Sequence, residues 1–227
     1  MGMRLELVQN SAEIEKIVSE ALCKEFNKHF FGLPAKLKPK FQQVVKDVFE
    51  QTETYDSLMN GVLRGEFGFP AGTERRFVGA VIKAIRDDLW IGFNKFKLNG
   101  TTIEGGLTVF LVKSTLEEIF KIQEASHKVA AKVGEYTQLV DINWLEWLLV
   151  DGDRIIIENY HFLHKLDAVG SRSEHGIMVP TQKTNLWYRV DPQYSGVIND
   201  NWITRTLEDY MNVFQNEWEK IIVQELS

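Results

Sequence analysis

The chain has 227 residues, of which 44% are hydrophobic and 26% are charged, and its formal net charge is −6. This composition is typical of a globular protein with one large domain or two small ones. The negative charge disfavours general nucleic-acid binding through neutralisation of phosphates. The apolar runs are too short to cross a bilayer, and no secretory signal is expected at the N-terminus. The single cysteine, Cys23, excludes an internal disulfide and is expected to be buried.

The first fifty residues predict two amphipathic helices. Apolar residues recur at helical spacing over residues 11–30, with Ser11 as the expected N-cap. A break rich in glycine and proline follows, and a second helix is predicted over residues 40–51. We therefore expect a single domain in which residues 1–52 form an N-terminal helical arm and residues 53–227 form the core.

The centre of the chain predicts helices on both sides of a pair of strands. Apolar stripes predict helices over residues 54–64 and 73–88. From residue 89 onward apolar and polar residues alternate, which predicts antiparallel strands at 89–98 and 106–113, joined by a glycine-containing turn. Helical spacing returns over residues 115–133, where a further helix is expected.

The second half of the chain predicts short strands. Residues 145–150 fit either a helical turn or a buried strand, and both interpretations stay open. Residues 154–160 are rich in β-branched side chains and predict a strand. A hairpin is predicted from residues 176–181 and 186–190.

A long amphipathic helix is predicted over residues 202–225, with Asn199 or Asp200 as its cap. Its apolar stripe is expected to dock across the sheet, since burying each large side chain is worth ~1.5–3 kcal/mol. The order of elements predicts the α+β class. The expected architecture is a mostly antiparallel sheet with helices packed on one face, the N-terminal helical arm and a long C-terminal helix.

The residues that could carry chemistry do not form a connected catalytic or metal site. His161 and His164 are three apart, so on an extended strand they face opposite sides and do not easily share a metal ion. Asp151, Asp153 and Glu158 could serve a metal-dependent nuclease, but acidic residues are ordinary in hairpin turns. No dinucleotide-binding, phosphate-loop or zinc-protease motif is present. We therefore expect no catalytic residue, no metal ion and no cofactor.

The segment 166–175 is interpreted as a mobile contact loop. Ser171, Ser173 and His175 lie close together in it, but nucleophilic catalysis needs a base that a third group holds in place. A loop rich in serine and glycine does not provide that rigidity, whereas exposed loops often carry binding residues.

The tryptophans of the second half are either core residues or contact residues. Trp144 and Trp147 share a face if their segment is helical, and they lie on opposite faces if it is extended. Trp187 and Tyr188 are adjacent in a predicted strand and must face opposite sides. Burial in the core is the ordinary fate of a tryptophan. An outward aromatic ring next to Arg189 would instead be an interface anchor, because tryptophan, tyrosine and arginine dominate binding hot spots.

Four segments of the second half resemble the C-terminal half of a family of tailed-bacteriophage proteins, the tail-completion or neck (head–tail joining) proteins. The segments are WLEWLL–GDRIII, SRSEHGIMV, W-Y-RV-P-Q-Y-SG and N-WITRTLED, with a weaker match at YDSLMNGVLRGEFGFP. The resemblance covers roughly residues 55–210. The matching positions are Trp144, Trp147, Gly152, Asp153, Ser171, Arg172, Gly176, Met178, Trp187, Arg189, Pro192, Gly196, Ile203, Thr204 and Arg205.

The resemblance implies a structural virion protein without enzymatic activity. It would form a homo-oligomeric ring, with six as the implied number of subunits, at the neck or at the top of the tail. Such a ring joins the head connector to the tail terminator and lets DNA pass through its lumen without sequence-specific binding, and it involves no membrane. The protein would be present in the host cytoplasm during assembly and in the virion afterwards.

The implied interaction residues are Trp144, Trp147, Ser171, Arg172, Trp187, Arg189 and Arg205. The loop 166–175 and the helical arm 11–50 are the segments expected to contact other proteins. Other functions remain open alternatives. The chain could be a tail terminator or another tail or baseplate adaptor, an adaptor that binds a peptide along an exposed strand edge, or a metal-dependent nuclease that uses Asp151 and Asp153 with a nearby histidine.

Overall fold

The structure is a computed structural model that describes residues 10–110, 116–133, 136–152, 160–164, 176–180 and 189–226. The helices are α1 (Ser11–Phe30), α2 (Leu33–Glu50), α3 (Glu53–Asn60), α4 (Val62–Glu66), α5 (Glu74–Asp87), α6 (Leu116–Phe120), the 3-10 turn η1 (Gln123–Ala125), α7 (Trp144–Leu149), α8 (Trp202–Asp209) and α9 (Met211–Leu226). The strands are β1 (Trp90–Asn99), β2 (Thr102–Phe110), β3 (His127–Val133), β4 (Tyr136–Ile142), β5 (Tyr160–His164) and β6 (Gly176–Pro180).

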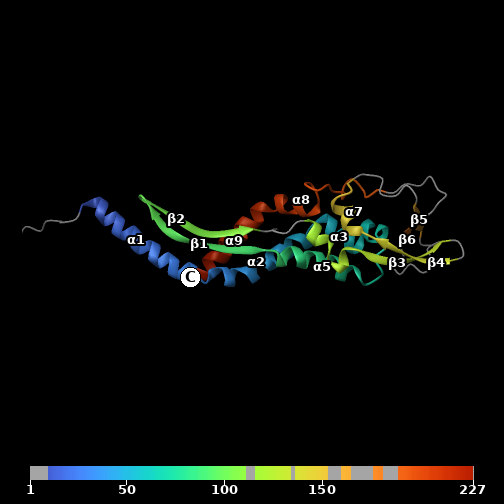
Figure 1. Cartoon of the computed structure of the whole chain (residues 1–227), viewed down its shortest axis with the longest axis horizontal. Coiled ribbons are helices and arrows are strands. Elements are labelled where there is room, and N and C mark those ends of the chain that lie inside the picture. The colour runs from blue at the N-terminus through green and yellow to red at the C-terminus, as the bar shows by residue number, and fades with distance from the viewer. Residues whose placement is uncertain are drawn as a thin grey trace, which may run out of the picture.

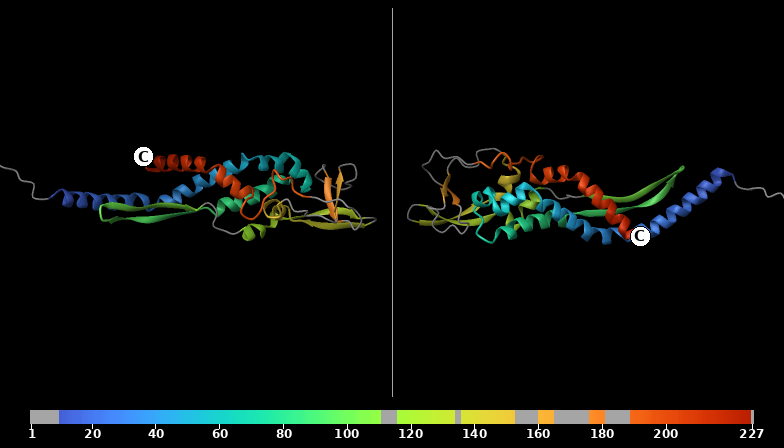
Figure 2. Two further views of the ribbon diagram at one scale, coloured as in Figure 1. Left: turned by 90° about the horizontal axis from the view of Figure 1, so that it is seen from above. Right: turned by 180° about the vertical axis from the view of Figure 1, so that it is seen from behind.

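The described chain is elongated, with a helical body in its middle (Figure 1). Helix α1 and the β1–β2 hairpin extend together from one end of this body, and β3 to β6 lie at the other end. The hairpin runs alongside α1 in the views of both Figure 1 and Figure 2, and the two elements are in contact. Seen from above in Figure 2, the C-terminal end of α9 lies apart from the hairpin.

Helix α1 confirms the predicted range 11–30, but its N-cap is Asn10 and not Ser11. The Asn10 side chain accepts a hydrogen bond from the backbone N–H of Glu13, and the Glu13 carboxylate accepts one from the Asn10 N–H. This reciprocal capping box satisfies two helix donors, which the Ser11 hydroxyl could not do from inside the first turn. Cys23 is buried, as expected.

Helix α2 begins at Leu33, seven residues before the predicted start at residue 40. Pro34 lies in the first turn, where its missing N–H has no helical partner to lose, and Pro39 is accommodated further along the helix. The apolar face of α2 is buried in the main core through Leu37, Phe41 and Phe49. Of the two helices in the expected arm, α1 is therefore largely exposed and α2 belongs to the packed body.

The helical body is built mainly from α2 to α5, α7 and α8. The largest fully buried side chains are Trp144, Phe49, Phe67, Phe69, Leu37, Leu58, Leu63, Ile85, Leu89, Ile142, Leu145 and Leu148. The predicted helix 73–88 is observed as α5. The predicted helix 54–64 is divided into α3 and α4 at Gly61, where a Cβ would lie 2.8 Å from the Ser57 Cα. The Ser57 hydroxyl accepts a hydrogen bond from the Leu63 N–H across this break, so a specific hydrogen bond stabilises the interruption between α3 and α4.

The α+β class is confirmed, and every strand pair in the described residues is antiparallel. The strands form three separate two-stranded ladders, β1–β2, β3–β4 and β5–β6. The predicted strands 89–98 and 106–113 are observed as β1 and β2, paired from Trp90 opposite Phe110 to Asn99 opposite Thr102. Their turn contains Gly100, which has a φ of 61° that favours glycine.

The predicted helix 115–133 is wrong beyond residue 120. Helix α6 ends at Phe120, and residues 127–133 form strand β3, which pairs with β4 from His127 opposite Ile142 to Val133 opposite Tyr136. The spacing of apolar residues in 127–133 fits a helix or a strand, and pairing with a β-rich partner decides for the strand. The open question at residues 145–150 is resolved as helix α7.

The predicted hairpin between residues 176–181 and 186–190 is also corrected. Strand β6 pairs with β5, which precedes it, with Tyr160 opposite Pro180. Residues 154–159 and 181–188 lie outside the described residues, so the strand predicted at 154–160 is described only from Tyr160 onward.

The predicted helix 202–225 is two helices, α8 and α9, which meet at Tyr210. The cap of α8 is Asn201, not Asn199 or Asp200. Helix α9 does not dock across a sheet. It packs on α2, where the Phe41 ring lies edge-on to Trp218 with centroids 5.3 Å apart. Within the described part of the chain, no helix is both long enough and apolar enough to cross a membrane.

Candidate interaction surface

Two of the residues expected to contact other proteins, Trp144 and Trp147, belong to the core instead. Trp144 is fully buried, its Nε1 donates to the Glu124 carbonyl at 2.8 Å, and its ring lies edge-on to Phe69 at 5.1 Å. Trp147 is 8% exposed. Helix α7 turns both side chains inward because residues three apart share a helix face. Neither indole presents a surface to a partner in this structure.

The remaining expected contact residues are distributed along the C-terminal part of the chain. Ser171, Arg172 and Trp187 lie outside the described residues, as does the loop 166–175. Arg189 is exposed at the start of the segment that leads into α8. Arg205 lies in the second turn of α8. The structure therefore does not bring these residues together into one described site.

Arg205 stabilises the turn before its own helix. Its Nε donates a hydrogen bond to the Asp200 carboxylate at 2.5 Å. This bond and the charge of the guanidinium lower the pKa of Asp200, and the same bond raises the pKa of Arg205. The Arg205 side chain is 37% exposed and Asp200 is 63% exposed, so the pair is mostly solvated and contributes little net stability.

The turn that precedes α8 requires particular residues at several of its positions. Asn201 is fully buried, and its side-chain oxygen accepts the N–H groups of Ile203 and Thr204 while its amide donates to the carbonyls of Val197 and Ile198. Gly196 passes so close that a Cβ there would lie 2.4 Å from the Asn201 Cβ. Several residues that carry the phage-family resemblance thus have a structural role in this turn.

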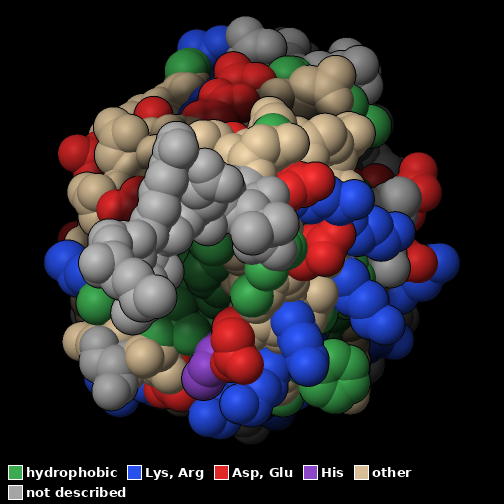
Figure 3. Space-filling model, turned by 90° about the vertical axis from the view of Figure 1, so that its left-hand side faces the viewer, with side chains coloured by type: hydrophobic (Ala, Val, Ile, Leu, Met, Phe, Trp, Pro, Cys, Tyr) green, Lys and Arg blue, Asp and Glu red, His purple; other side chains and the backbone are tan. Residues whose placement is uncertain are grey.

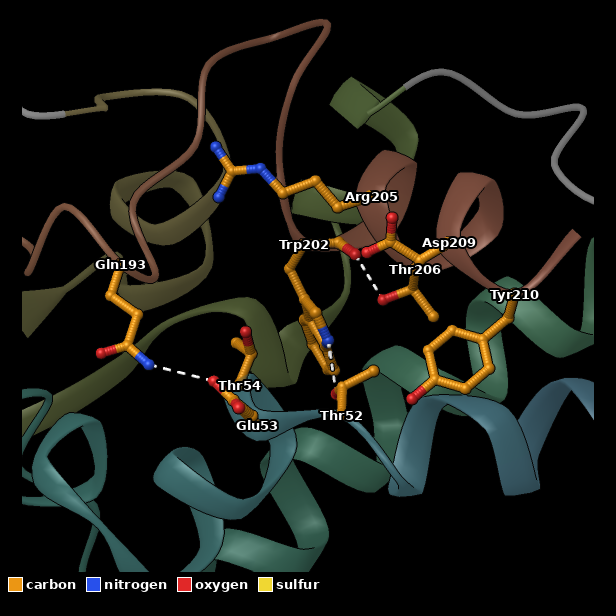
Figure 4. Close-up of a pocket in the computed structure, with 9 residues that line it drawn as sticks. All are labelled: Thr52, Glu53, Thr54, Gln193, Trp202, Arg205, Thr206, Asp209 and Tyr210. Atoms are coloured by element: carbon orange, nitrogen blue, oxygen red, sulfur yellow. Dashed lines mark hydrogen bonds between the residues drawn. The ribbon is translucent and has the colours of Figure 1, made fainter.

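An open pocket of about 220 Å³ lies beside this turn (Figure 4). It is lined by Thr52, Glu53, Thr54, Gln193, Trp202, Arg205, Thr206, Asp209 and Tyr210. Trp202 Nε1 donates to Thr52 Oγ1 at 3.0 Å, and Gln193 Nε2 donates to Glu53 Oε2 at 3.0 Å. Figure 4 shows the Arg205 guanidinium directed away from the Trp202–Thr52 pair. These bonds join the α2–α3 junction to the C-terminal segment, and the lining offers no nucleophile paired with a base.

Among the described residues, the acidic and histidine side chains considered for metal chemistry do not form a metal-binding cluster. Within the described ranges, no group of three or more His, Cys, Asp or Glu side chains could hold a metal ion. Asp153 and Glu158 lie outside these ranges, while Asp151 lies at the end of α7. His161 and His164 lie on strand β5.

His127 is a core residue. Its Nε2 lies 2.8 Å from the Phe67 carbonyl, and its ring packs against both Phe69 and Phe77, with centroids 5.5 and 5.2 Å away. Burial lowers the pKa of His127, so the neutral ring donates this bond from Nε2. Its Nδ1 is buried without a hydrogen-bond partner among the described residues. This environment suits a packed histidine.

The structure shows an exposed apolar surface on α1, within the arm 11–50 that was expected to contact other proteins, and a second patch on the hairpin that the sequence did not indicate. Five large apolar residues of α1 are 36–51% exposed: Ile14, Ile17, Val18, Leu22 and Phe26. Trp90 and Phe110 are 43% and 52% exposed at the base of the hairpin, with ring centroids 5.4 Å apart. The α1 stripe was visible in the sequence, but periodicity does not reveal whether the same chain covers a stripe.

The α1 surface lies at an end of the molecule with a mixed charge distribution. Looking onto this end, Figure 3 shows hydrophobic side chains gathered in a hollow, with acidic and basic side chains around it. A groove of about 420 Å³ separates α1 from the hairpin tip and is lined by Ala12, Glu15, Lys16, Ser19, Leu98, Gly100 and Thr101. The chain matches no protein-family model, no curated protein and no solved structure.

Proposed function

We propose that the chain is a structural virion protein of a tailed bacteriophage. It forms a homo-oligomeric ring, with six subunits, at the neck or the top of the tail, and joins the head connector to the tail terminator. Its role is geometric, and it catalyses no reaction. The observation that carries this proposal is the apolar face of α1, which the described chain leaves in water on a helix that projects from the body.

An exposed apolar face of this size supports a contact function. The five α1 side chains present roughly 400 Å² of surface, within the range of ~300–600 Å² at which the largest patch of a typical monomer is often functional. A second apolar patch, Trp90 with Phe110, lies on the hairpin. A subunit with contact surfaces at separate places suits a closed ring, in which each subunit meets its neighbours through different patches.

The polar features support the same class of function. In the pocket beside α8, the indole of Trp202 and the amide of Gln193 bind other parts of the same chain. They stabilise the fold there and are not arranged around a substrate. The net charge of −6 also suits a ring through which DNA must slide without adhering. We place the protein in the host cytoplasm during assembly and in the virion neck afterwards, without a cofactor or a membrane.

The test is the effect of removing the protein from assembling particles. We expect heads and tails that are complete but unjoined, as seen by negative-stain electron microscopy, and restoration of joining by the chain supplied in trans. A tag inserted at Gly100, in the exposed hairpin turn, should then locate the chain at the head–tail junction. Infectious particles that form without the chain would overturn the proposal.

Two further outcomes separate the alternatives. A tag found only at the far end of the tail tube would indicate a baseplate adaptor. Magnesium- or manganese-dependent cleavage of DNA by the purified chain, lost on Asp151→Asn, would indicate a nuclease. Either result contradicts the neck assignment.

A further inference from the structure

Helix α1 has two faces with different surroundings. The face that contains Cys23 and Asn27 packs on the hairpin, and Asn27 bonds to both backbone groups of Phe96. At roughly 100° per residue, the stripe of Ile14, Ile17, Val18, Ala21 and Leu22 is centred about 180° around the helix from Cys23. The more apolar face of α1 therefore points away from the β1–β2 hairpin, on which the opposite face of α1 packs.

One border of this stripe is acidic near its N-terminal end, at Glu13, and basic near its C-terminal end, at Lys24. Glu25 also lies at the C-terminal end, where it pairs with Lys28 and His29 at 3.6 and 3.5 Å. Glu13 and Lys24 share one border of the stripe, since their positions are about 80° and 100° around the helix from Cys23. An antiparallel copy of the same helix would bring each acidic end beside a basic end. A parallel copy would bring like charges together, which is unfavourable.

We propose that a second copy of this chain covers the apolar face of α1 in the free protein, through antiparallel α1–α1 pairing about a two-fold axis at Val18. This register places Ile14 opposite Leu22 of the partner subunit. It also brings Glu13 within one residue of the position opposite Lys24 of the partner subunit. The contact is isologous, because the same surface is used on both copies.

The second copy fits this face better than a lipid surface does. Interfacial membrane helices carry many lysines and arginines on their polar face. Helix α1 has four glutamates and three lysines, so it lacks the positive excess that anionic lipids attract. Along one border of the stripe Glu13 precedes Lys24, so these two charges are complementary to those of an antiparallel copy.

The contact is expected to be weak and reversible. Phe26 packs on Phe96 and is not part of this stripe, so each copy offers less than the roughly 400 Å² of the five exposed side chains, under half of the ~800 Å² that each partner buries in a standard interface. Interfaces smaller than the standard size are typical of transient association, so we expect a dissociation constant on the order of micromolar. A weak dimer protects the apolar face before assembly and can release it when another surface binds more tightly. The proposal concerns the free chain and stands or falls separately from the ring at the neck.

The first test is the mass of the purified full chain against concentration, by analytical ultracentrifugation. We expect a shift from monomer to dimer over the micromolar range. Val18→Asp should raise the dissociation constant at least about tenfold, because it places two carboxylates at the two-fold axis. Glu20→Gln, an exposed change outside the stripe, is the matched control and should leave the dissociation constant unchanged. A wild-type chain that stays monomeric to hundreds of micromolar overturns the proposal.

The second test fixes the direction of the pairing. In a Cys23→Ser background, Ile14→Cys and Leu22→Cys are made separately and oxidised alone and as a mixture. Antiparallel pairing predicts a strong disulfide-linked heterodimer in the mixture and little homodimer from either variant alone. Abundant Ile14→Cys homodimer would indicate a parallel pair, and linkage in neither case would indicate a different surface. Both results overturn the register.

The third test uses the charges. Lys24→Glu places two acidic groups together and should weaken the dimer, whereas adding Glu13→Lys should restore it by reversing the pair. Glu13→Lys also removes half of the α1 capping box, so circular dichroism must accompany the measurement. Recovery of the dimer in the double variant, despite the weaker cap, supports the pairing. No recovery in a double variant that keeps its helix content overturns the proposed contact.

Discussion

Asn27 of α1 binds both backbone groups of Phe96 in β1. Its Oδ1 accepts the Phe96 N–H at 2.8 Å, and its Nδ2 donates to the Phe96 carbonyl at 2.9 Å. The β1–β2 register shifts between Asn94 and Lys97, so the β2 ladder leaves Phe96 without its regular partner. The Asn27 amide therefore takes the place of a neighbouring strand at this bulge and fixes α1 on the hairpin, which turns the apolar stripe outward.

Asn27→Asp should loosen α1 from the hairpin. The carboxylate can still accept the Phe96 N–H, but its second oxygen faces the Phe96 carbonyl, where a donor is needed. We expect a loss of about 1–3 kcal/mol, the usual penalty for a part-buried polar group left without its partner. Hydrogen exchange of the α1 amides should accelerate. Asn94→Ala removes an exposed bond to Thr108 in the same hairpin and should change the free energy of unfolding by less than ~0.5 kcal/mol.

His127 should make stability depend on pH. Burial lowers its pKa from the ordinary value of 6.5, so the unfolded chain binds this proton more readily than the folded chain does. The stabilisation is fully present above pH 6.5 and is lost as pH falls from 6.5 through the folded-state pKa.

His127→Gln should remove this dependence, because its amide can donate to the Phe67 carbonyl without titrating. Urea unfolding of both proteins between pH 5 and pH 8 gives the comparison. We expect the free energy of unfolding of the wild type, minus that of the variant, to decrease as pH falls. A difference that is constant with pH would contradict a lowered pKa.

The sequence predicts a helix most accurately where clear helix-start and helix-stop residues bound its apolar stripe. The stripe of α5 has no competing strand pattern, and the observed helix lies within one residue of the prediction at each end. Residues 127–133 fit helix and strand equally, and only pairing with β4 decides between them. Such pairing is a tertiary effect that local spacing does not contain.

The candidate surface could be predicted only in part. The stripe of α1 is evident in the sequence, but what covers it depends on where Asn27 anchors the helix. Trp144 and Trp147 show the opposite case, since the family resemblance implied that they are contact residues, whereas helix α7 buries both. Whether an aromatic residue is inside or outside depends on the element that carries it, which was ambiguous between helix and strand in the sequence.

Gly196→Ala should destabilise the turn before α8. A Cβ at this position would lie 2.4 Å from the Asn201 Cβ and 2.6 Å from its Cα, so backbone must move. We expect a loss of about 1–3 kcal/mol from overpacking, with added loss if the Asn201 cap is broken. Gly79→Ala in α5 is the matched control, because nothing lies within 4 Å of its added Cβ. That change should stabilise by about 0.5–1 kcal/mol, since alanine favours the helix. Urea unfolding of both variants tests the contrast.

Thr52 holds together three parts of the fold through one hydroxyl. Its Oγ1 donates to the Phe49 carbonyl at 2.8 Å and accepts from the Tyr55 N–H at 3.2 Å, which caps α3. It also accepts from Trp202 Nε1 at 3.0 Å. Thr52→Val keeps the shape but removes the cap, worth about 1 kcal/mol, and leaves the indole N–H unpaired, at about 1–3 kcal/mol.

The expected total loss is therefore about 2–4 kcal/mol, and the cause can be separated with two further variants. Thr52→Ser keeps the hydroxyl and should lose much less stability than Thr52→Val. Trp202→Phe removes the N–H that would be orphaned, so Thr52→Val should be less damaging in that background than in the wild type. Equal effects of Thr52→Val in both backgrounds would mean that the 3.0 Å bond to Trp202 contributes nothing, and that Trp202 is held in place by apolar packing such as its contact with Phe49.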